Sequence, residues 1–223
     1  MTETEWLACA DPQRMIRFVS RLAWGERRRR LFTVACCRKL KVLPDDRLAG
    51  AIETAERFAD GQANDSELSI AIGIAREAVE WEARHDMNSW QSHAAEVVAA
   101  ATRFPTGDDI AIDEFVAWAQ TEQEEVDEAS AIWANQTLAN LVRELVGNPF
   151  RPVAFAVEWR TDTVMLLAQQ MYDSRDFGAM PILADALQDA GCHNADILNH
   201  CRDTHAEHVR GCWVVDCVLR GSD

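Results

Sequence analysis

The sequence predicts an all-α protein, a multi-helix orthogonal or bundle-like domain followed by a small C-terminal helical subdomain. Three observations lead to this prediction. Apolar residues recur at three- and four-residue intervals along most of the chain, which is the period of an amphipathic helix. Capping residues and Gly or Pro stops separate these segments. No segment alternates polar and apolar residues over the length that a half-buried strand requires.

The first half of the chain is predicted to hold five helices. The first begins with Asp11 as N-cap and Pro12 in the first turn, where proline is tolerated. The second begins at Arg27, the third follows Pro44, and the fourth begins after the capping residue Asn64. The fifth is rich in Ala and Val. Their expected ranges are 11–23, 27–40, 44–60, 64–84 and 89–102.

The central range 108–146 is predicted to be one long helix or two helices joined near Thr121. Apolar residues recur at helical spacing throughout it. From Phe104 through Val142 there is no Lys or Arg, and the acidic residues cluster here. A solvated helix face and a docking face for a basic partner both explain this pattern.

Two prolines mark the best domain boundary, because Pro149 and Pro152 cannot continue a helix. We therefore expect a helical domain over 1–146, with basic N-terminal helices and acidic central helices, and a C-terminal helical subdomain over 147–223. Residues 153–159 are expected to be extended. The helices expected after them lie at 161–173, 180–190, 195–202 and 209–220, the second of which ends at Gly191.

The charge of the chain is strongly negative and unevenly distributed. The net charge is −15, which disfavours binding to nucleic acid or to an anionic membrane. Residues 1–43 nevertheless carry ten Arg or Lys against four Asp or Glu, a local charge of +6. Arg27–Arg30 lie in the first turn of a predicted helix, where the macrodipole disfavours cations. This run is either a solvated turn or a dock for carboxylates or phosphates of the acidic helices or of a partner.

The chain is expected to be cytoplasmic. Its first residues have neither the basic nor the apolar region of a secretory signal, and no segment has 18 uncharged apolar residues. It has seven cysteines, an odd number that includes the adjacent pair Cys36–Cys37. Reduced thiols in a cytosol fit this pattern better than a disulfide framework. A protein partner or self-association is expected.

Two stretches resemble a family. The N-terminal EWLACxDP and RLFxVACCR, and the C-terminal NPFRPV, ILADALxxAGC and HVRGCWVVD, resemble a paralogous family of bacterial proteins from planctomycete-type genomes. The two stretches together cover about half of the chain, and the C-terminal one is the more specific. The resemblance implies a shared architecture and no particular activity.

The last thirty-odd residues, from Gly191 onward, contain the best candidate for a metal site. Zinc is usually held by four Cys or His ligands arranged as two close pairs. If the last helix begins at His208, then His208 and Cys212 lie one turn apart on one face. Cys192 and His200 are the expected first pair, although seven residues separate them. Cys201 and Cys217 are expected in the core, and His193 and His205 at the surface.

The alternative is that no metal binds and that the cysteines are small core residues, which is a common role for free cysteine. Two weaker candidates can likewise be explained either as functional sites or as ordinary structural residues. Glu82 and His85 form one Glu-x-x-His, but a di-iron bundle needs two copies. Cys36–Cys37 lie next to Arg38, whose charge favours a reactive thiolate, whereas core packing favours an inert thiol.

Two functions remain open on the sequence alone. One is a non-catalytic protein-interaction or regulatory module with a structural zinc ion held by Cys192, His200, His208 and Cys212. The other is a metal-dependent enzyme that uses the same Cys/His cluster. The first is favoured because no phosphate-binding loop, His-Glu-x-x-His or Gly-x-Ser-x-Gly motif is present.

Replacing Cys212 by alanine is expected to lower the Tm more than replacing Cys36 by alanine. The reason is that Cys212 is placed in the organising cluster, whereas Cys36 is placed in an ordinary helix. Thermal unfolding of both variants measures the difference. Equal or reversed shifts would count against the C-terminal cluster.

Overall fold

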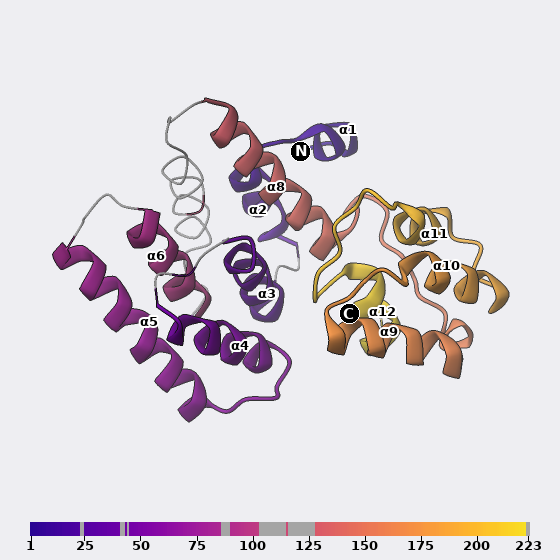
Figure 1. The fold of residues 1–223 in the computed structure, drawn as a ribbon. Coiled ribbons are helices and arrows are strands. Elements are labelled where there is room, and N and C mark those ends of the chain that lie inside the picture. Colours follow the sequence, from indigo (N-terminus) through magenta and orange to yellow (C-terminus); the bar gives the residue numbers. More distant parts are fainter. Residues whose placement is uncertain are drawn as a thin grey trace. The chain divides into compact units, whose positions relative to one another are not determined.

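A computed structural model describes residues 1–22, 25–40, 43, 45–85, 90–102, 115 and 128–221. Within these ranges the regular elements are eleven α-helices and one short 3₁₀ helix, with no strand, so the all-α prediction is confirmed (Figure 1). No described helix has both the length and the apolar character needed to cross a membrane. Residues 108–114 and 116–127, where one or two helices were expected, lie outside the described residues.

The chain divides into two units, Met1–Val142 and Arg143–Asp223. The sequence placed the boundary at the proline-rich break after residue 146, four residues later. The difference arises because helix α8, Glu128–Val146, continues without interruption to Gly147, while its last turn already packs with the C-terminal unit. A boundary defined by helix-breaking residues therefore assigns the last turn of α8 to the wrong unit.

The N-terminal unit begins with a short helix that the sequence prediction missed. Thr2 accepts a hydrogen bond from the backbone N–H of Glu5, and the Glu5 carboxylate accepts one from the N–H of Thr2. This reciprocal capping box is readable in the sequence as Thr-x-x-Glu. The described helices of this unit are α1 (Glu3–Ala8), α2 (Pro12–Val19), α3 (Glu26–Cys37), α4 (Arg47–Ala59), α5 (Asp65–His85), α6 (Trp90–Thr102) and most of α8.

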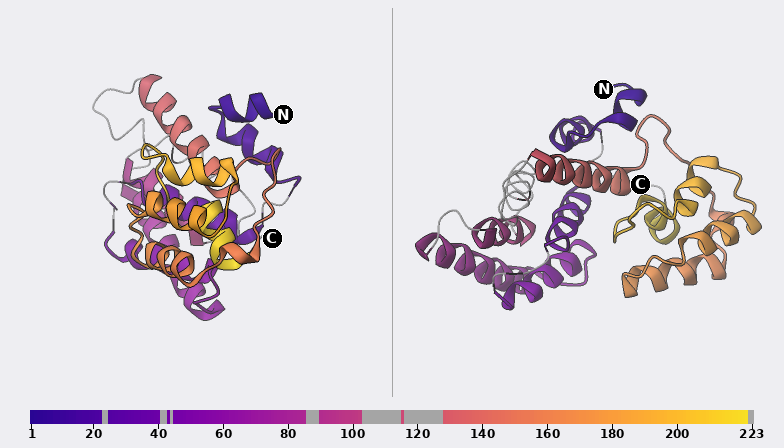
Figure 2. Two further views of the ribbon diagram at one scale, coloured as in Figure 1. Left: turned by 90° about the vertical axis from the view of Figure 1, so that its right-hand side faces the viewer. Right: turned by 45° about the horizontal axis from the view of Figure 1, so that its top comes forward.

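Helix α3 lies at the centre of the N-terminal unit. It packs against α4 and α6, and α5 packs against both of those helices (Figures 1 and 2). Seven consecutive residues of α3, Leu31–Cys37, are buried, which explains why its apolar residues are not confined to one face. Cys36 and Cys37 are among them, and burial raises the pKa of both thiols. The reactive-thiolate alternative is therefore wrong, and core packing is right.

The contacts of Arg30 explain one of the four arginines in the first turns of α3. Its side chain is buried, and its guanidinium donates to the carbonyl oxygens of Ala101 and Thr102, each at 3.1 Å. These carbonyls end α6, where the helix macrodipole favours a cation. The guanidinium also lies 5.0 Å over the Phe58 ring and 3.3 Å from a Glu26 oxygen. The buried guanidinium of Arg30 therefore stabilises the N-terminal unit by capping the C-terminal end of α6.

Arg27 also has a partner within the N-terminal unit. Its guanidinium lies 3.1 Å from a carboxylate oxygen of Asp60, whose side chain is buried at the end of α4. Arg27 and Arg30 therefore both bind groups within the N-terminal unit, so neither needs an external partner to explain its charge.

The C-terminal unit packs four helices around its own apolar core. They are α9 (Asp162–Ser174), α10 (Met180–Asp189), α11 (Ala195–Arg202) and α12 (Trp213–Arg220). Helix α9 packs against α10 and α12, and α11 packs against both α10 and α12. The expected extended segment 153–159 forms no strand. It is a loop ending in the 3₁₀ turn Val157–Trp159, and Phe155 and Trp159 pack edge to face.

Replacing Arg30 by leucine is expected to lower the free energy of unfolding by about 2–4 kcal/mol. Leucine leaves the final carbonyls of α6 buried without a donor. Urea unfolding followed by circular dichroism measures the loss. The matched control is Arg28→Leu in the same turn, where a partly exposed side chain should cost less than about 1 kcal/mol. Equal costs at the two positions would contradict the capping role of Arg30.

Candidate metal centre

Four side chains of the C-terminal unit converge on one point. Glu144 comes from the last turn of α8, and His200 comes from α11. His208 and Cys212 come from the segment that joins α11 to α12, and Cys212 is the N-cap residue of α12. One potential ligand atom from each residue lies within 4.8 Å of every other.

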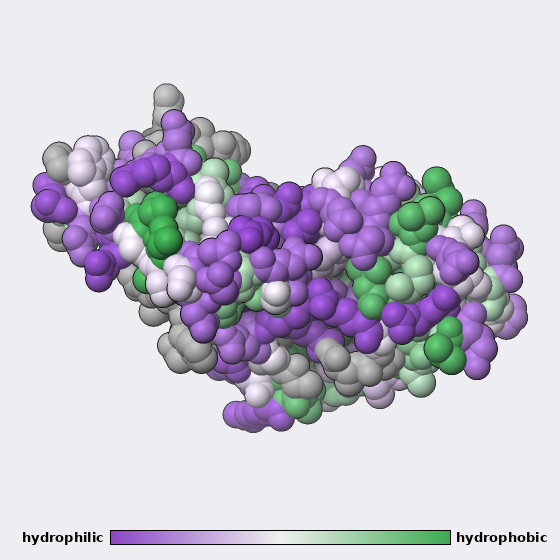
Figure 3. Space-filling model, turned by 90° about the horizontal axis from the view of Figure 1, so that it is seen from below, coloured by the Kyte–Doolittle hydropathy of each residue, from purple (hydrophilic) through white to green (hydrophobic). Residues whose placement is uncertain are grey.

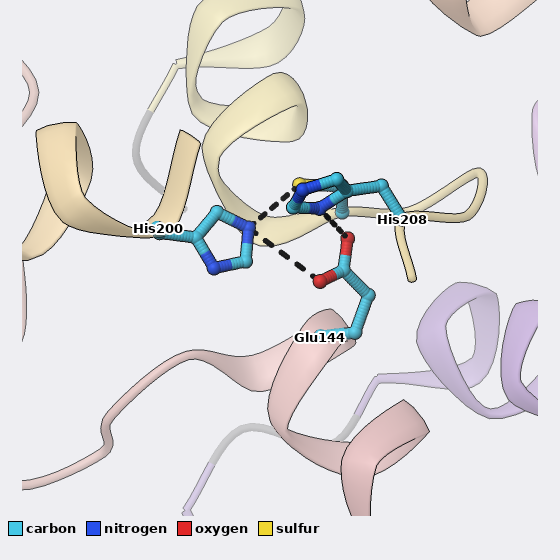
Figure 4. A group of neighbouring side chains, drawn as sticks. Glu144, His200 and His208 are labelled. Atoms are coloured by element: carbon cyan, nitrogen blue, oxygen red, sulfur yellow. Dashed lines mark hydrogen bonds and ion pairs between the residues drawn. The ribbon is translucent and has the colours of Figure 1, made fainter. Parts of the chain in front are cut away.

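The contacts within this cluster run through Glu144 and His200 (Figure 4). Oε1 of Glu144 lies 3.1 Å from Nδ1 of His208, and Oε2 lies 3.5 Å from Nε2 of His200. The same Nε2 lies 3.2 Å from Sγ of Cys212. The two imidazole rings meet edge to face, with their centroids 4.9 Å apart. The carboxylate thus lies between the two histidines.

These separations match the edges of a tetrahedral zinc site. Bond lengths of about 2.0–2.1 Å to nitrogen or oxygen and about 2.3 Å to sulfur give edges of roughly 3.3 Å between two light atoms and roughly 3.5 Å between nitrogen and sulfur. The observed 3.5 Å between Glu144 and His200 and 3.2 Å between His200 and Cys212 lie within a few tenths of an ångström of these values. Two of the six edges of such a tetrahedron therefore already have the required length, and every pair of ligand atoms lies within 4.8 Å.

The cluster is buried and electrostatically incomplete. The side chains of Glu144 and His208 are each 5% exposed, that of His200 is 16% exposed, and Cys212 is fully buried. In the described part of the chain, no Lys or Arg forms an ion pair with Glu144. Burying a carboxylate costs several kcal/mol unless a positive charge compensates it. A divalent cation at this point would supply that charge.

The protonation of the cluster also favours a cation. Burial lowers the pKa of His200, so its imidazole is neutral at neutral pH and keeps a lone pair for coordination. Burial, with the nearby Glu144 carboxylate, raises the pKa of the Cys212 thiol well above its usual value. A coordinated metal ion reverses this effect, because it stabilises the thiolate directly.

His208 shows that protein groups alone do not satisfy the cluster. Its Nδ1 pairs with Glu144, but its Nε2 is buried and has no hydrogen-bond partner. A buried polar atom left in this state costs about 1–3 kcal/mol. Buried polar atoms without a partner are rare in proteins, and among the described side chains the atoms of this kind are Nε2 of His208 and Nε of Arg160 alone.

Arg210 fixes the segment that carries His208 and Cys212. Its Nε donates to the carbonyl of Tyr172 at 2.6 Å, and Nη2 donates to the carbonyl of Asp173 at 3.2 Å. The guanidinium also lies 5.0 Å over the Tyr172 ring. One side chain therefore ties the segment to the C-terminal end of α9, where the macrodipole favours a cation.

Trp213 and Gly147 bring the remaining parts together. Gly147 ends α8 with φ +72°, and the indole of Trp213 lies so close that a Cβ on Gly147 would be 3.0 Å from it. The same indole lies 5.2 Å from the His200 ring, between centroids. Trp213 therefore touches the ends of the two helices that carry Glu144 and His200, and follows Cys212 directly in the chain.

The structure brings together three of the four predicted ligands, His200, His208 and Cys212. Cys192 is not in the group. It follows the turn that ends α10, with its N–H bonded to the carbonyl of Leu187, and its side chain is buried in the core of the C-terminal unit. His208 and Cys212 were expected to lie one turn apart on the last helix. That helix, α12, begins only at Trp213, so the expected start near residue 209 is wrong and both residues lie in the segment before the helix.

Glu144 is the member that the sequence prediction missed. The predicted ligands are all cysteine or histidine, and Glu144 lies well before the C-terminal stretch that begins at Gly191. One signal was available. An acidic residue in the last turn of a helix opposes the macrodipole, so it calls for a compensating contact. Local misfits of this kind concentrate at functional sites.

The other candidates fall outside the cluster. Cys201 is fully buried, while His193 and His205 are exposed, as expected. Cys217 is only half-buried, although it was expected in the core. Burial raises the pKa of Cys201 to about 12, which makes it an inert thiol. The side chain of His85, the partner of Glu82 in the weaker motif, lies outside the described residues.

Comparisons with protein-family models, with curated proteins and with solved structures find no match to this chain. The resemblance to a bacterial paralogous family therefore stays a prediction, and the case for the site depends on its geometry.

Replacing Gly147 by alanine is expected to lower metal affinity at least about tenfold. A Cβ at this position requires a strained positive φ and pushes on the Trp213 ring, which displaces Glu144 from Cys212 and His200. Competition with a zinc indicator dye measures the affinity. Gly61→Ala, which also has a positive φ but has no atom near its Cβ, is the control. An unchanged affinity in Gly147→Ala would show that this contact does not position the ligands.

Proposed function

We propose that the chain is a non-catalytic helical interaction or regulatory module whose C-terminal unit is held by a structural zinc ion. The ligands are Glu144, His200, His208 and Cys212. The observation that supports this most is the clustering of one potential ligand atom from each of the four residues within 4.8 Å of every other. The buried Nε2 of His208, which has no hydrogen-bond partner among the described residues, is a second. The module role remains the one favoured by the absence of catalytic motifs from the sequence.

The donor set favours zinc over other common cations. Magnesium and calcium prefer all-oxygen sites, and copper(I) prefers thiolates and thioethers. One thiolate, two imidazoles and one carboxylate in a tetrahedral arrangement are donors that zinc accepts in proteins. The close match of the two measured edges to a tetrahedron supports the same choice.

The arrangement supports a structural role for the ion. Four protein ligands fill a tetrahedral centre, whereas a catalytic zinc ion keeps one position for water or substrate. The ligand side chains are at most 16% exposed, which leaves little access for a substrate. The ligands also come from α8, α11 and the segment before α12. An ion bound to all three would therefore join the two ends of this unit.

Purified, tag-free protein is expected to hold one zinc ion per chain by elemental analysis. Removing it with a chelator should lower the Tm, because a ligand at 1,000 times its Kd stabilises a fold by about 4 kcal/mol. Replacing the ion by cobalt should give the intense absorption of a tetrahedral thiolate complex, and this absorption should disappear in Cys212→Ser.

Cys201→Ser and His193→Ala are the controls for this experiment. Both lie in the C-terminal unit but outside the cluster, so both should keep the ion. Retention of zinc by Cys212→Ser or His208→Ala, or failure of the wild-type protein to take up zinc, would refute the site. An ion with three protein ligands and an exchangeable water would instead favour the alternative, a metal-dependent enzyme.

A further inference from the structure

Arg17 of α2 and Arg21 of the turn after it differ from the other arginines that the structure describes. The side chains of Arg17 and Arg21 have no hydrogen-bond or ion-pair partner within the described residues. Arginines in α3, α4 and the turn after α3 do pair with carboxylates, as the following five show: Arg27, Arg30, Arg38, Arg47 and Arg57. In a chain of net charge −15, two unpaired cations on α2 and the turn after it are a local exception.

Arg17 and Arg21 belong to a row with Arg14. The three residues are spaced by three and four positions, which places them on one face of α2 and the turn that follows it. Arg14 pairs with Glu5 at 2.8 Å but remains about half exposed, and the other two are exposed. We call these three residues the α2 arginine row.

The row borders a hollow in the surface of about 350 Å³. The hollow is lined by the three arginines together with Met1, Asp11 and Phe18. Phe18 packs on Trp6, with the ring centroids 6.3 Å apart, so it gives the hollow a firm apolar wall. Asp11 is the one carboxylate in the lining, and it is engaged as the cap of α2. The hollow therefore combines three guanidinium groups with one apolar surface.

We propose that the α2 arginine row binds an acidic segment of a partner protein. Guanidinium groups suit carboxylates because each can form two parallel hydrogen bonds. Carboxylates at one-turn spacing on a partner helix would match the spacing of the row. This inference rests on the proposed role of the chain as an interaction module, and it names the chemistry of the partner.

Charge favours an acidic protein segment over a longer polyanion. A chain of net charge −15 repels nucleic acid or an anionic membrane over the whole surface. A short acidic segment is affected less, because charges more than about 8 Å away are screened at physiological salt. On the face shown in Figure 3, the coloured hydrophobic residues lie in separate patches among hydrophilic ones.

The experiment uses the full chain and a fluorescent oligo-glutamate peptide. Anisotropy titrations should show binding that is stronger at about 50 mM than at about 150 mM salt. The double variant Arg17→Glu/Arg21→Glu should lower the affinity about tenfold or more. The matched control is Arg76→Glu/Arg84→Glu on α5, which makes the same change in net charge at another exposed helix and should lower the affinity less than about threefold.

Four outcomes would overturn the proposal. Equal losses in the two double variants would show an effect of net charge alone, and binding no stronger than that of an uncharged peptide would show no site. Preference for single-stranded DNA over oligo-glutamate would assign the row to a polyanion. Self-association that Arg17→Glu/Arg21→Glu abolishes, without peptide binding, would make the partner a second copy of the chain.

Zinc content, measured on the same samples, separates this proposal from the previous one. Protein that takes up no zinc but binds oligo-glutamate through the row would refute the zinc site alone. Protein loaded with zinc that shows no preference for the acidic peptide would refute the docking face alone.

Discussion

The buried carboxylate of Glu144, placed between the imidazoles of His200 and His208, is the constraint on which the C-terminal unit depends. A carboxylate at 5% exposure is tolerated only when its charge is compensated, and burial keeps His200 neutral. The Cys212 thiol beside it is protonated for the same electrostatic reason. Each of these costs would fall if one divalent cation occupied the centre of the cluster.

The two units use opposite means to bury charge. In the N-terminal unit the buried guanidinium of Arg30 is satisfied by the carbonyls at the end of α6 and by the Phe58 ring, so its environment is complete. In the C-terminal unit Arg210 does the same for the end of α9. The Glu144 cluster lacks such completion, because one nitrogen of His208 remains without a partner. This contrast is one of the observations on which the proposed metal site rests.

Local sequence signals predicted much of the fold and part of the site. Periodicity and caps located α4, α5 and α9–α11 closely, because those helices bury one face and begin or end at Asn, Thr or Gly. The start of α12 was misplaced because Gly211 adopts φ +91°, which is not helical, so the helix begins only at Trp213 after the N-cap Cys212. His200, His208 and Cys212 were found by residue type. Glu144 was not, because its place in the last turn of a helix indicates only that it needs a compensating contact, and the folded chain is needed to show that the contact is with this cluster.

The end of α8 has a consequence for the modularity of the chain. Glu144 precedes the proline-rich break, so a cut at the most obvious junction would leave three of the four clustered residues on one side and the carboxylate on the other. The C-terminal unit can be transferred to another protein with its cluster intact only if the transferred segment includes the last turn of α8. Recombination at the prolines would therefore yield a segment that contains all of α9–α12 but lacks Glu144, one of the four clustered residues.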